Sequence, residues 1–365
     1  MKISKNVMQF AAGNMDLFAK FADYWKHYQA TQEKNTKVEY DTTVTFAEKE
    51  DKLNAALKKE IIRRSGVSYA NETNIDEWFS HPLVAHETFA IVGALVDMIL
   101  PESIIETIGL YTDVRVGGWG DSFAFDIEPR DLFVVSKAGK GQKISEIHKQ
   151  FKGQVTIVPE FRQLTVGVSM YRVLSGQESL AAFVAKVVRS IETRMTLDAY
   201  NAFATATAAL ASTANTGLQV AGYTQAGLVS LAQRVQAWNQ GAKPLFVGTQ
   251  LALVNVLPDD ANYRYTLNDE YMTLGYVRTA FGFDTMVLPQ VADLTTPFGA
   301  NVLSNSYIWV ISPASQKILK LCMEGNTLSN TNQPFDNANL TQNTSMVKAW
   351  GVGVATSAVC GIMSL

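Results

Sequence analysis

The chain has 365 residues, of which 47% are hydrophobic and 18% charged, and its formal net charge is −3. This hydrophobic content is enough for a large buried core and excludes a disordered chain. The near-neutral charge argues against a dedicated nucleic-acid reader, which would carry a strongly basic face. Cys322 and Cys360 both lie in apolar stretches, and we expect two buried free thiols rather than a disulfide.

Residues 1–99 predict mainly helices. Residues 18–28 are aromatic and amphipathic, and residues 46–66 combine a thin apolar stripe with many charges before a glycine. Residues 46–66 form either a helix that lies on a surface, such as that of a neighbouring subunit, or an amphipathic helix in the core of their own chain. The first residues lack the apolar core of a signal peptide. Residues 89–100 are apolar but too short to span a bilayer, and they predict a buried helix.

Residues 104–174 change to the period-two pattern of strands, with Phe123, Phe125 and Ile127 on one face. A polar segment, residues 135–154, separates two pairs of predicted strands. Loops of this length without structure of their own are uncommon and usually functional. The segment therefore predicts either a projecting hairpin that contacts another molecule or a plain surface loop.

Residues 175–210 predict one uninterrupted helix, which would be about 50 Å long. Ser175 and Glu178 have the spacing of a capping box, and apolar residues recur at helical spacing behind them. Helices and strands then alternate, with Thr249 as a helix N-cap, and the last twenty residues predict strands. Together these elements predict an α+β fold.

The order of these elements resembles that of the major capsid proteins of tailed phages, which have the Hong Kong 97-like capsid fold. Residues 100–117 are similar to the lead-in strands, residues 121–174 to the extended loop and its return, and residues 179–203 to the spine helix. Residues 243–257 and 281–293 are similar to the apical domain, and residues 349–362 to the terminal strand. The resemblance covers about residues 100–365 and is one of architecture.

This resemblance implies a division of the chain. The expected parts are a helical N-terminal arm (1–99), peripheral-domain strands (100–120), an extended β-hairpin loop (121–162), the peripheral domain with its spine helix (163–215), an apical domain (216–335) and C-terminal strands that return to the peripheral domain (336–365).

The resemblance also implies a function and partners. The subunits would assemble with one another into hexamers and pentamers of an icosahedral head that encloses double-stranded DNA, bound without sequence preference. Portal, scaffold and decoration proteins are further implied partners. The expected location is the virion capsid, assembled in the host cytoplasm, with no membrane partner.

The tip of the extended loop is the candidate inter-subunit contact. Its candidate residues are Lys137, Lys140, Lys143, Glu146, His148 and Lys149. Some relatives crosslink a loop lysine to an asparagine of a neighbour. The four lysines of this tip could supply the amine and the asparagine-rich residues 333–345 the amide. We identify no carboxylate that this chemistry would need.

Other candidate sites do not carry catalytic chemistry. His81 and His86 are five residues apart, so a helix would not bring both to one metal ion. The glycine-rich residues 117–122 and 139–143 lack the Lys-Ser/Thr pair of a phosphate-binding loop, and we find no nucleophile elbow. We therefore expect no enzyme, cofactor or metal site.

Two alternatives remain open at this point. An encapsulin-like compartment would share the fold but enclose cargo enzymes, so the content of the particle would distinguish it. A soluble α/β enzyme would be a monomer or small oligomer with a defined pocket.

Overall fold

The computed structural model describes most of the chain. The described residues are 14–31, 38–67, 81–108, 112–127, 152–168, 172–173, 175–212, 217–256, 271, 273–288, 290, 303–312, 317–331 and 342–365. All six candidate residues of the loop tip, Lys137 to Lys149, lie outside these ranges.

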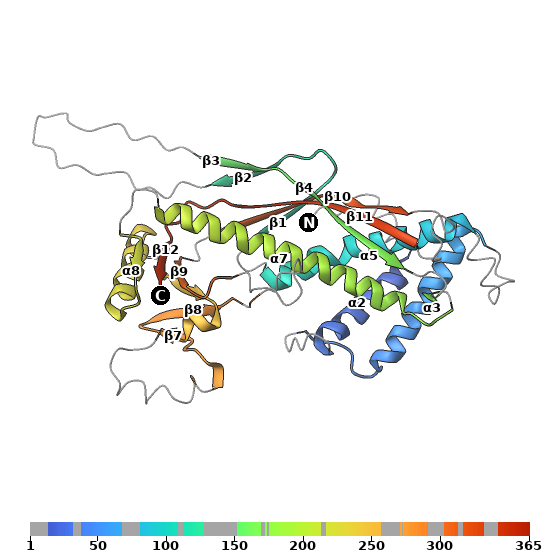
Figure 1. The fold of residues 1–365 in the computed structure, drawn as a ribbon, viewed down its shortest axis with the longest axis horizontal. Coiled ribbons are helices and arrows are strands. Elements are labelled where there is room, and N and C mark those ends of the chain that lie inside the picture. The colour runs from blue at the N-terminus through green and yellow to red at the C-terminus, as the bar shows by residue number, and fades with distance from the viewer. Residues whose placement is uncertain are drawn as a thin grey trace, which may run out of the picture.

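Helices and strands are mixed along the chain and confirm the predicted α+β class (Figure 1). The helices are α2 (Met15–Thr31), α3 (Phe46–Ser65), α5 (Pro82–Ile108), α7 (Leu180–Ser212), α8 (Gln225–Trp238) and α9 (Gln250–Leu253). The long helix α7 runs through the molecule and connects the helices at one end to a second sheet at the other (Figure 1).

The N-terminal helices belong to the core of their own subunit. Phe21 and Tyr24 of α2 and Leu53 and Leu57 of α3 are buried in one cluster with side chains of α5 and α7. Thr45 caps the start of α3 by accepting a hydrogen bond from the Glu48 amide. The sequence left open whether residues 46–66 lie on a surface or in the core of their own chain, and the structure supports the core.

Helix α5 is longer than predicted. It continues through Pro101 to Ile108, so the expected strand pattern from residue 104 is wrong at its start, and the first strand begins at Thr112. Leu100 and Ile104 are fully buried on either side of the proline, and we attribute the continued helix to the stabilisation gained from this burial.

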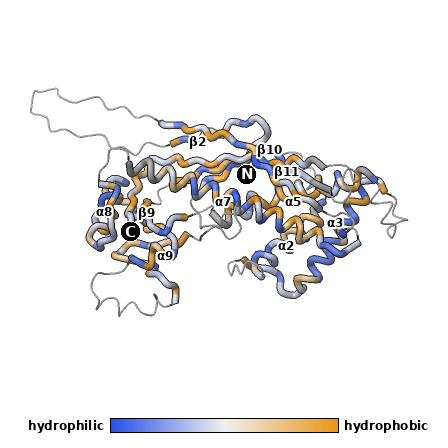
Figure 2. Tube along the Cα trace, viewed as in Figure 1, coloured by the Kyte–Doolittle hydropathy of each residue, from blue (hydrophilic) through white to orange (hydrophobic). Residues whose placement is uncertain are grey.

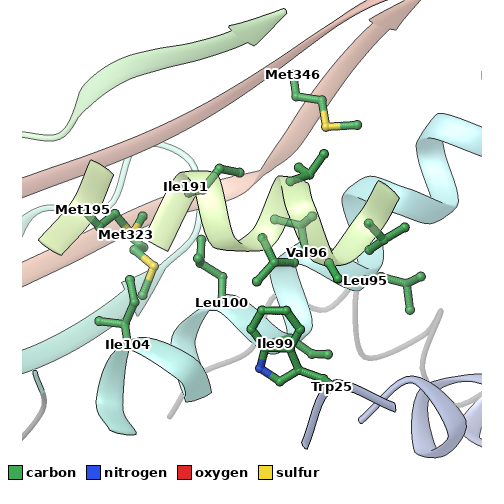
Figure 3. Close-up of a cluster of buried hydrophobic side chains, with 14 of the residues drawn as sticks. Trp25, Leu95, Val96, Ile99, Leu100, Ile104, Ile191, Met195, Met323 and Met346 are labelled. Atoms are coloured by element: carbon green, nitrogen blue, oxygen red, sulfur yellow. The ribbon is translucent and has the colours of Figure 1, made fainter. Parts of the chain in front are cut away.

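By length and composition alone, the same helix is long and apolar enough over Leu83–Ile105 to cross a membrane. The sequence had suggested a shorter apolar run. In the structure most of this apolar stretch is buried inside the protein, and Figure 3 shows Leu100 and Ile104 facing Ile191 and Met195 of α7. Figure 2 shows the hydrophobic colour concentrated along this helix. Helix α5 is therefore a core helix, as predicted for residues 89–100.

The start of α7 differs from the predicted capping box. The helix begins at Leu180, and Ser179 caps it by accepting a hydrogen bond from the Ala182 amide at 3.2 Å. Asn54 of α3 accepts a second one from the Ala181 amide at 3.0 Å. Because the cap partner comes from α3, 125 or more residues away in the chain, the local pattern at Ser175 could not reveal it.

Two larger sheets lie along α7. The first has the order β1 (Thr112–Gly117), β10 (Leu319–Thr331), β11 (Gln342–Val354) and β4 (Glu160–Val168). The second has the order β5 (Gln219–Ala221), β12 (Gly361–Ser364), β9 (Tyr307–Ile311), β6 (Leu245–Gly248), β8 (Phe283–Val287) and β7 (Thr279–Ala280). In the first sheet β1 is parallel to β10, and the other two pairs are antiparallel.

The predicted division into domains stays a prediction, but one helix and two strands do not follow its boundaries. Helix α5 runs past residue 99, and β10 joins β11 in the four-stranded sheet although it lies within the expected apical range. Strand β12 pairs with β9 in the six-stranded sheet, whereas β11 pairs with β4. The C-terminal segment thus contributes to both sheets.

Candidate assembly surface

A two-stranded hairpin lies on the outer face of the four-stranded sheet. It consists of β2 (Phe123–Ile127) and β3 (Gly153–Ile157), and the four-stranded sheet separates it from α7 (Figure 1). The predicted alternation is confirmed in β2, where Phe123 and Phe125 are buried and Asp126 is exposed. Lys152 pairs with Asp126 at 2.7 Å across the hairpin and lowers the pKa of that carboxyl.

The hairpin is attached by a small hydrophobic cluster of its own. The hairpin cluster comprises Phe123, Phe125 and Ile157 from the hairpin and Cys322 from β10. Two cations flank the Phe125 ring, with the Arg115 guanidinium carbon 4.2 Å and the Lys320 Nζ 5.7 Å from its centroid. Burial lowers the pKa of Lys320 against the opposing effect of Asp113.

Glycines in β11 allow the hairpin to lie close to the sheet. A Cβ atom on Gly351 would come within 2.7 Å of the Val158 carbonyl oxygen and 2.9 Å of the Ile157 side chain. A Cβ atom on Gly353 would likewise come within 2.9 Å of the Ile157 side chain. Cys322 lies beneath the hairpin, and burial raises the pKa of its thiol to about 11. Both cysteines are free and buried, as predicted.

A tight turn joins β1 to the hairpin and touches the sheet. The Gly118 amide donates to Asp121 Oδ2 at 2.7 Å, and the Gly120 amide donates to Glu324 Oε1 at 2.6 Å. The Trp119 ring lies over Gly325, whose φ of +61° suits glycine and whose missing side chain makes room for the ring. The turn is thereby held to a bulge in β10 between Glu324 and Leu328.

Beside the hairpin, four large apolar side chains remain exposed. They are Trp119 (45% exposed), Val158 (75%), Phe161 (66%) and Leu328 (52%), which we call the outer patch. Trp119 stacks on Phe161 with a centroid distance of 6.0 Å. The strand register places Leu328 opposite Val347, on the face that also carries Phe161. Several such side chains together on one surface are typical of an interaction site.

A buried ion pair fixes the same bulge from the helical side. Lys348 Nζ lies 2.6 Å from Asp97 Oδ1, and both side chains are 6% exposed. Thr327 donates to Asp97 through its amide and its hydroxyl, at 2.7 and 2.6 Å. Lys348 also donates to the Gly325 carbonyl at 2.8 Å. The bulge thus lies between Trp119 on the outer face and Asp97 of α5.

A cavity of about 420 Å³ lies between α7 and the sheet. Its walls include Leu164 of β4, Ile191 of α7, and Met346 and Trp350 of β11. Arg162 and Arg194 also line it, and both pair with Asp198, at 3.5 and 3.2 Å. Asp198 further accepts a hydrogen bond from the Trp350 indole at 3.1 Å.

The outer patch was not predicted from the sequence. Residues 117–122 were considered as a phosphate-binding loop, although a tryptophan in a glycine-rich turn is itself an unusual feature. The exposure of Phe161 and Leu328 depends on which face of the sheet the hairpin leaves open, and no local signal shows that. Within the described ranges, no group of three His, Cys, Asp or Glu side chains could hold a metal ion.

Comparison with known proteins gives both structural and sequence matches. The mature capsid of bacteriophage PhiM1 is 14% identical, with a TM-score of 0.42, and covers 70% of this chain and 86% of that chain. The capsid of the native GTA particle is 12% identical, with a TM-score of 0.47, and covers 69% and 88%. A protein of Mycobacterium phage Bobi is 11% identical, with a TM-score of 0.44, and covers 72% and 89%.

No curated protein matches the chain. At these identities and TM-scores the structural matches carry no argument by themselves, and the assignment depends on the family model. That model is described as "SPbeta prophage-derived putative capsid protein YonB" and matches residues 16–364, nearly the whole chain. The capsid resemblance predicted from the order of elements is therefore confirmed, and the chain belongs to the YonB family of prophage-derived capsid proteins.

Proposed function

We propose that this chain is the major capsid protein of a tailed-phage head. It self-assembles into hexamers and pentamers of an icosahedral shell that encloses double-stranded DNA. One observation carries this proposal beyond family membership. Among the described residues, the hairpin is held to its own subunit by a small buried cluster and a few polar contacts, and it lies beside an exposed apolar patch, a feature typical of an interaction site.

The proposed mechanism is geometric. The extension of the hairpin, residues 128–151, covers a neighbouring subunit, and its ordering is coupled to assembly. The tip residues then form the inter-subunit contact, as proposed from the sequence: Lys137, Lys140, Lys143, Glu146, His148 and Lys149. The shell forms in the host cytoplasm with portal, scaffold and decoration proteins, and basic residues of its interior contact DNA without sequence preference.

Electron microscopy of the purified full-length chain tests this proposal, with absorbance at 260 and 280 nm read on the same particles. We expect closed shells, and native particles whose absorbance ratio shows nucleic acid. Shells filled with protein instead would indicate a cargo compartment. A small symmetric oligomer with no shells under any assembly condition would contradict the proposal.

The outer patch offers a second test at a single side chain. We expect Phe161→Ser to leave the free energy of unfolding within about 0.5 kcal/mol of the parent, because the ring is mostly exposed. The same variant should form far fewer shells, because it removes the most exposed ring of the patch. Phe161→Tyr keeps the ring and is the matched control. Normal shell formation by Phe161→Ser would remove the patch from the proposed contact.

A further inference from the structure

Strand β4 has one edge without a partner strand in the described part of the chain. It is the last strand of the four-stranded sheet, and β11 pairs with it continuously from Glu160 to Val168. A nine-residue edge strand presents a row of backbone amides and carbonyls to which another strand can pair. Proteins usually protect such an edge or use it for binding.

Apolar surface lies on both faces of this edge. On the helical face, the cavity of about 420 Å³ lies between β4 and α7, with Leu164 and Ile191 in its walls. On the outer face, Phe161 is 66% exposed. A strand added about 4.8 Å from β4 would therefore direct alternate side chains toward the cavity and toward Phe161.

A strand covered on both faces has a continuous apolar sequence rather than an alternating one. The hairpin extension contains such a run in residues 132–135, Leu-Phe-Val-Val. It begins five residues after the end of β2 at Ile127 and precedes the polar tip. Asp131, just before the run, would place a second carboxylate beside Arg194, whose side chain pairs with Asp198 at 3.2 Å and is 44% exposed beside the cavity.

The extension is long enough to reach another subunit. Residues 128–151 join Ile127 to Lys152, and half of that length in extended conformation spans about 40 Å. The ends of β2 and β3 that carry the extension point toward one end of the molecule, whereas β4 runs toward the other end (Figure 1). The expected acceptor is therefore β4 of a second copy rather than of the same subunit.

We propose that residues 132–135 of one subunit add as a strand to the free edge of β4 in a second copy. Phe133 and Val135 then face the outer side of the extended sheet beside Phe161, and Leu132 and Val134 fill the cavity. This inference depends on the proposed assembly function and specifies how its main contact is made.

The test uses two full-length chains that assemble together, one carrying Val135→Cys and the other Gln163→Cys. Gln163 lies on the exposed outer face of β4. A third chain with Thr165→Cys tests a pairing register that is shifted by two residues along β4. After mild oxidation, we expect a disulfide-linked dimer of the two different chains in shells. The matched control is Gln219→Cys on β5, an edge strand of the other sheet, for which we expect roughly tenfold less dimer because disulfides need close Cα atoms.

A second variant tests the cavity. Ser190→Phe fills it from α7, and we expect the dimer yield with Gln163→Cys to fall by about tenfold because the added strand loses the space for its side chains. Thr205→Phe, at an exposed position of the same helix, should leave the yield unchanged. Shells without disulfide-linked dimer at either β4 position would overturn strand addition, and so would an equal yield of dimer at the β5 position. Neither result would contradict the proposed assembly function. Absence of shells from all chains would overturn both.

Discussion

The core of the subunit and its hairpin are stabilised in different ways. The core unites α2, α3, α5 and α7 with the helical face of the four-stranded sheet in one continuous set of buried side chains. The hairpin contributes three buried side chains, which pack on Cys322 of β10, and two glycines of β11 let it approach the sheet. We propose from this difference that the core folds by itself and that the hairpin becomes fully stable only against a neighbour.

The same substitution in both regions tests this difference most strongly. Phe21 in the core and Phe125 in the hairpin cluster are both fully buried. We expect Phe21→Ala to lower the free energy of unfolding by about 3–5 kcal/mol. Phe125→Ala should lower it by less, because the loss is limited to the free energy of opening the hairpin.

Urea denaturation would measure both values, and a thiol reagent would report hairpin opening through Cys322. We expect Cys322 to react rapidly only in Phe125→Ala. If both variants lost the same global stability and Cys322 stayed protected, the hairpin would have to be counted as part of the core.

The ion pair between Asp97 and Lys348 should give the next largest effect. Asp97→Ala leaves the Lys348 ammonium buried without its carboxylate, and we expect a loss of about 3 kcal/mol in the free energy of unfolding. Adding Lys348→Met removes the unpaired charge and should restore much of the loss. Chemical denaturation of the two variants checks this, and a double variant no more stable than the single one would contradict it.

We expect a smaller loss of stability from a substitution at Gly351, where β11 lies close to the hairpin. Gly351→Ala places a Cβ atom against the Val158 carbonyl and Ile157, and we expect a loss of about 1–3 kcal/mol together with faster Cys322 labelling. Gly93→Ala in α5 is the control, because its Cβ atom would meet only ordinary contacts at 3.6 Å or more. Equal labelling rates for the two variants would show that the glycine is not needed for the hairpin.

The smallest expected effect is a pH dependence at Cys322. Burial raises the pKa of its thiol to about 11 from an ordinary value of 9.0. The unfolded chain therefore releases the proton first, and the stability contribution is complete below pH 9 and lost as the pH rises toward 11. We expect the free energy of unfolding to fall by about 1 kcal/mol more between pH 8 and pH 10 in the parent than in Cys322→Ala.

Much of the fold followed from local patterns. The end of α3 at Gly66, the cap at Thr249 and the alternation of Phe123 and Phe125 each depend on neighbours in the chain, and the structure confirms them. The true cap of α7 depends on Asn54, a residue distant in the sequence. The outer patch could not be predicted, because it depends on which part of a sheet face the hairpin covers. The loop-tip contacts remain a proposal.

The central claim is that the hairpin extension drives assembly while the core folds without it. Replacing residues 129–151 by Asn-Gly closes the hairpin with a two-residue turn and keeps the pairing of Ile127 with Gly153. We would compare this variant with the full chain by electron microscopy and circular dichroism. The account predicts a folded subunit that forms no closed shells under conditions in which the full chain forms them. Closed shells in normal yield from the shortened chain would contradict it.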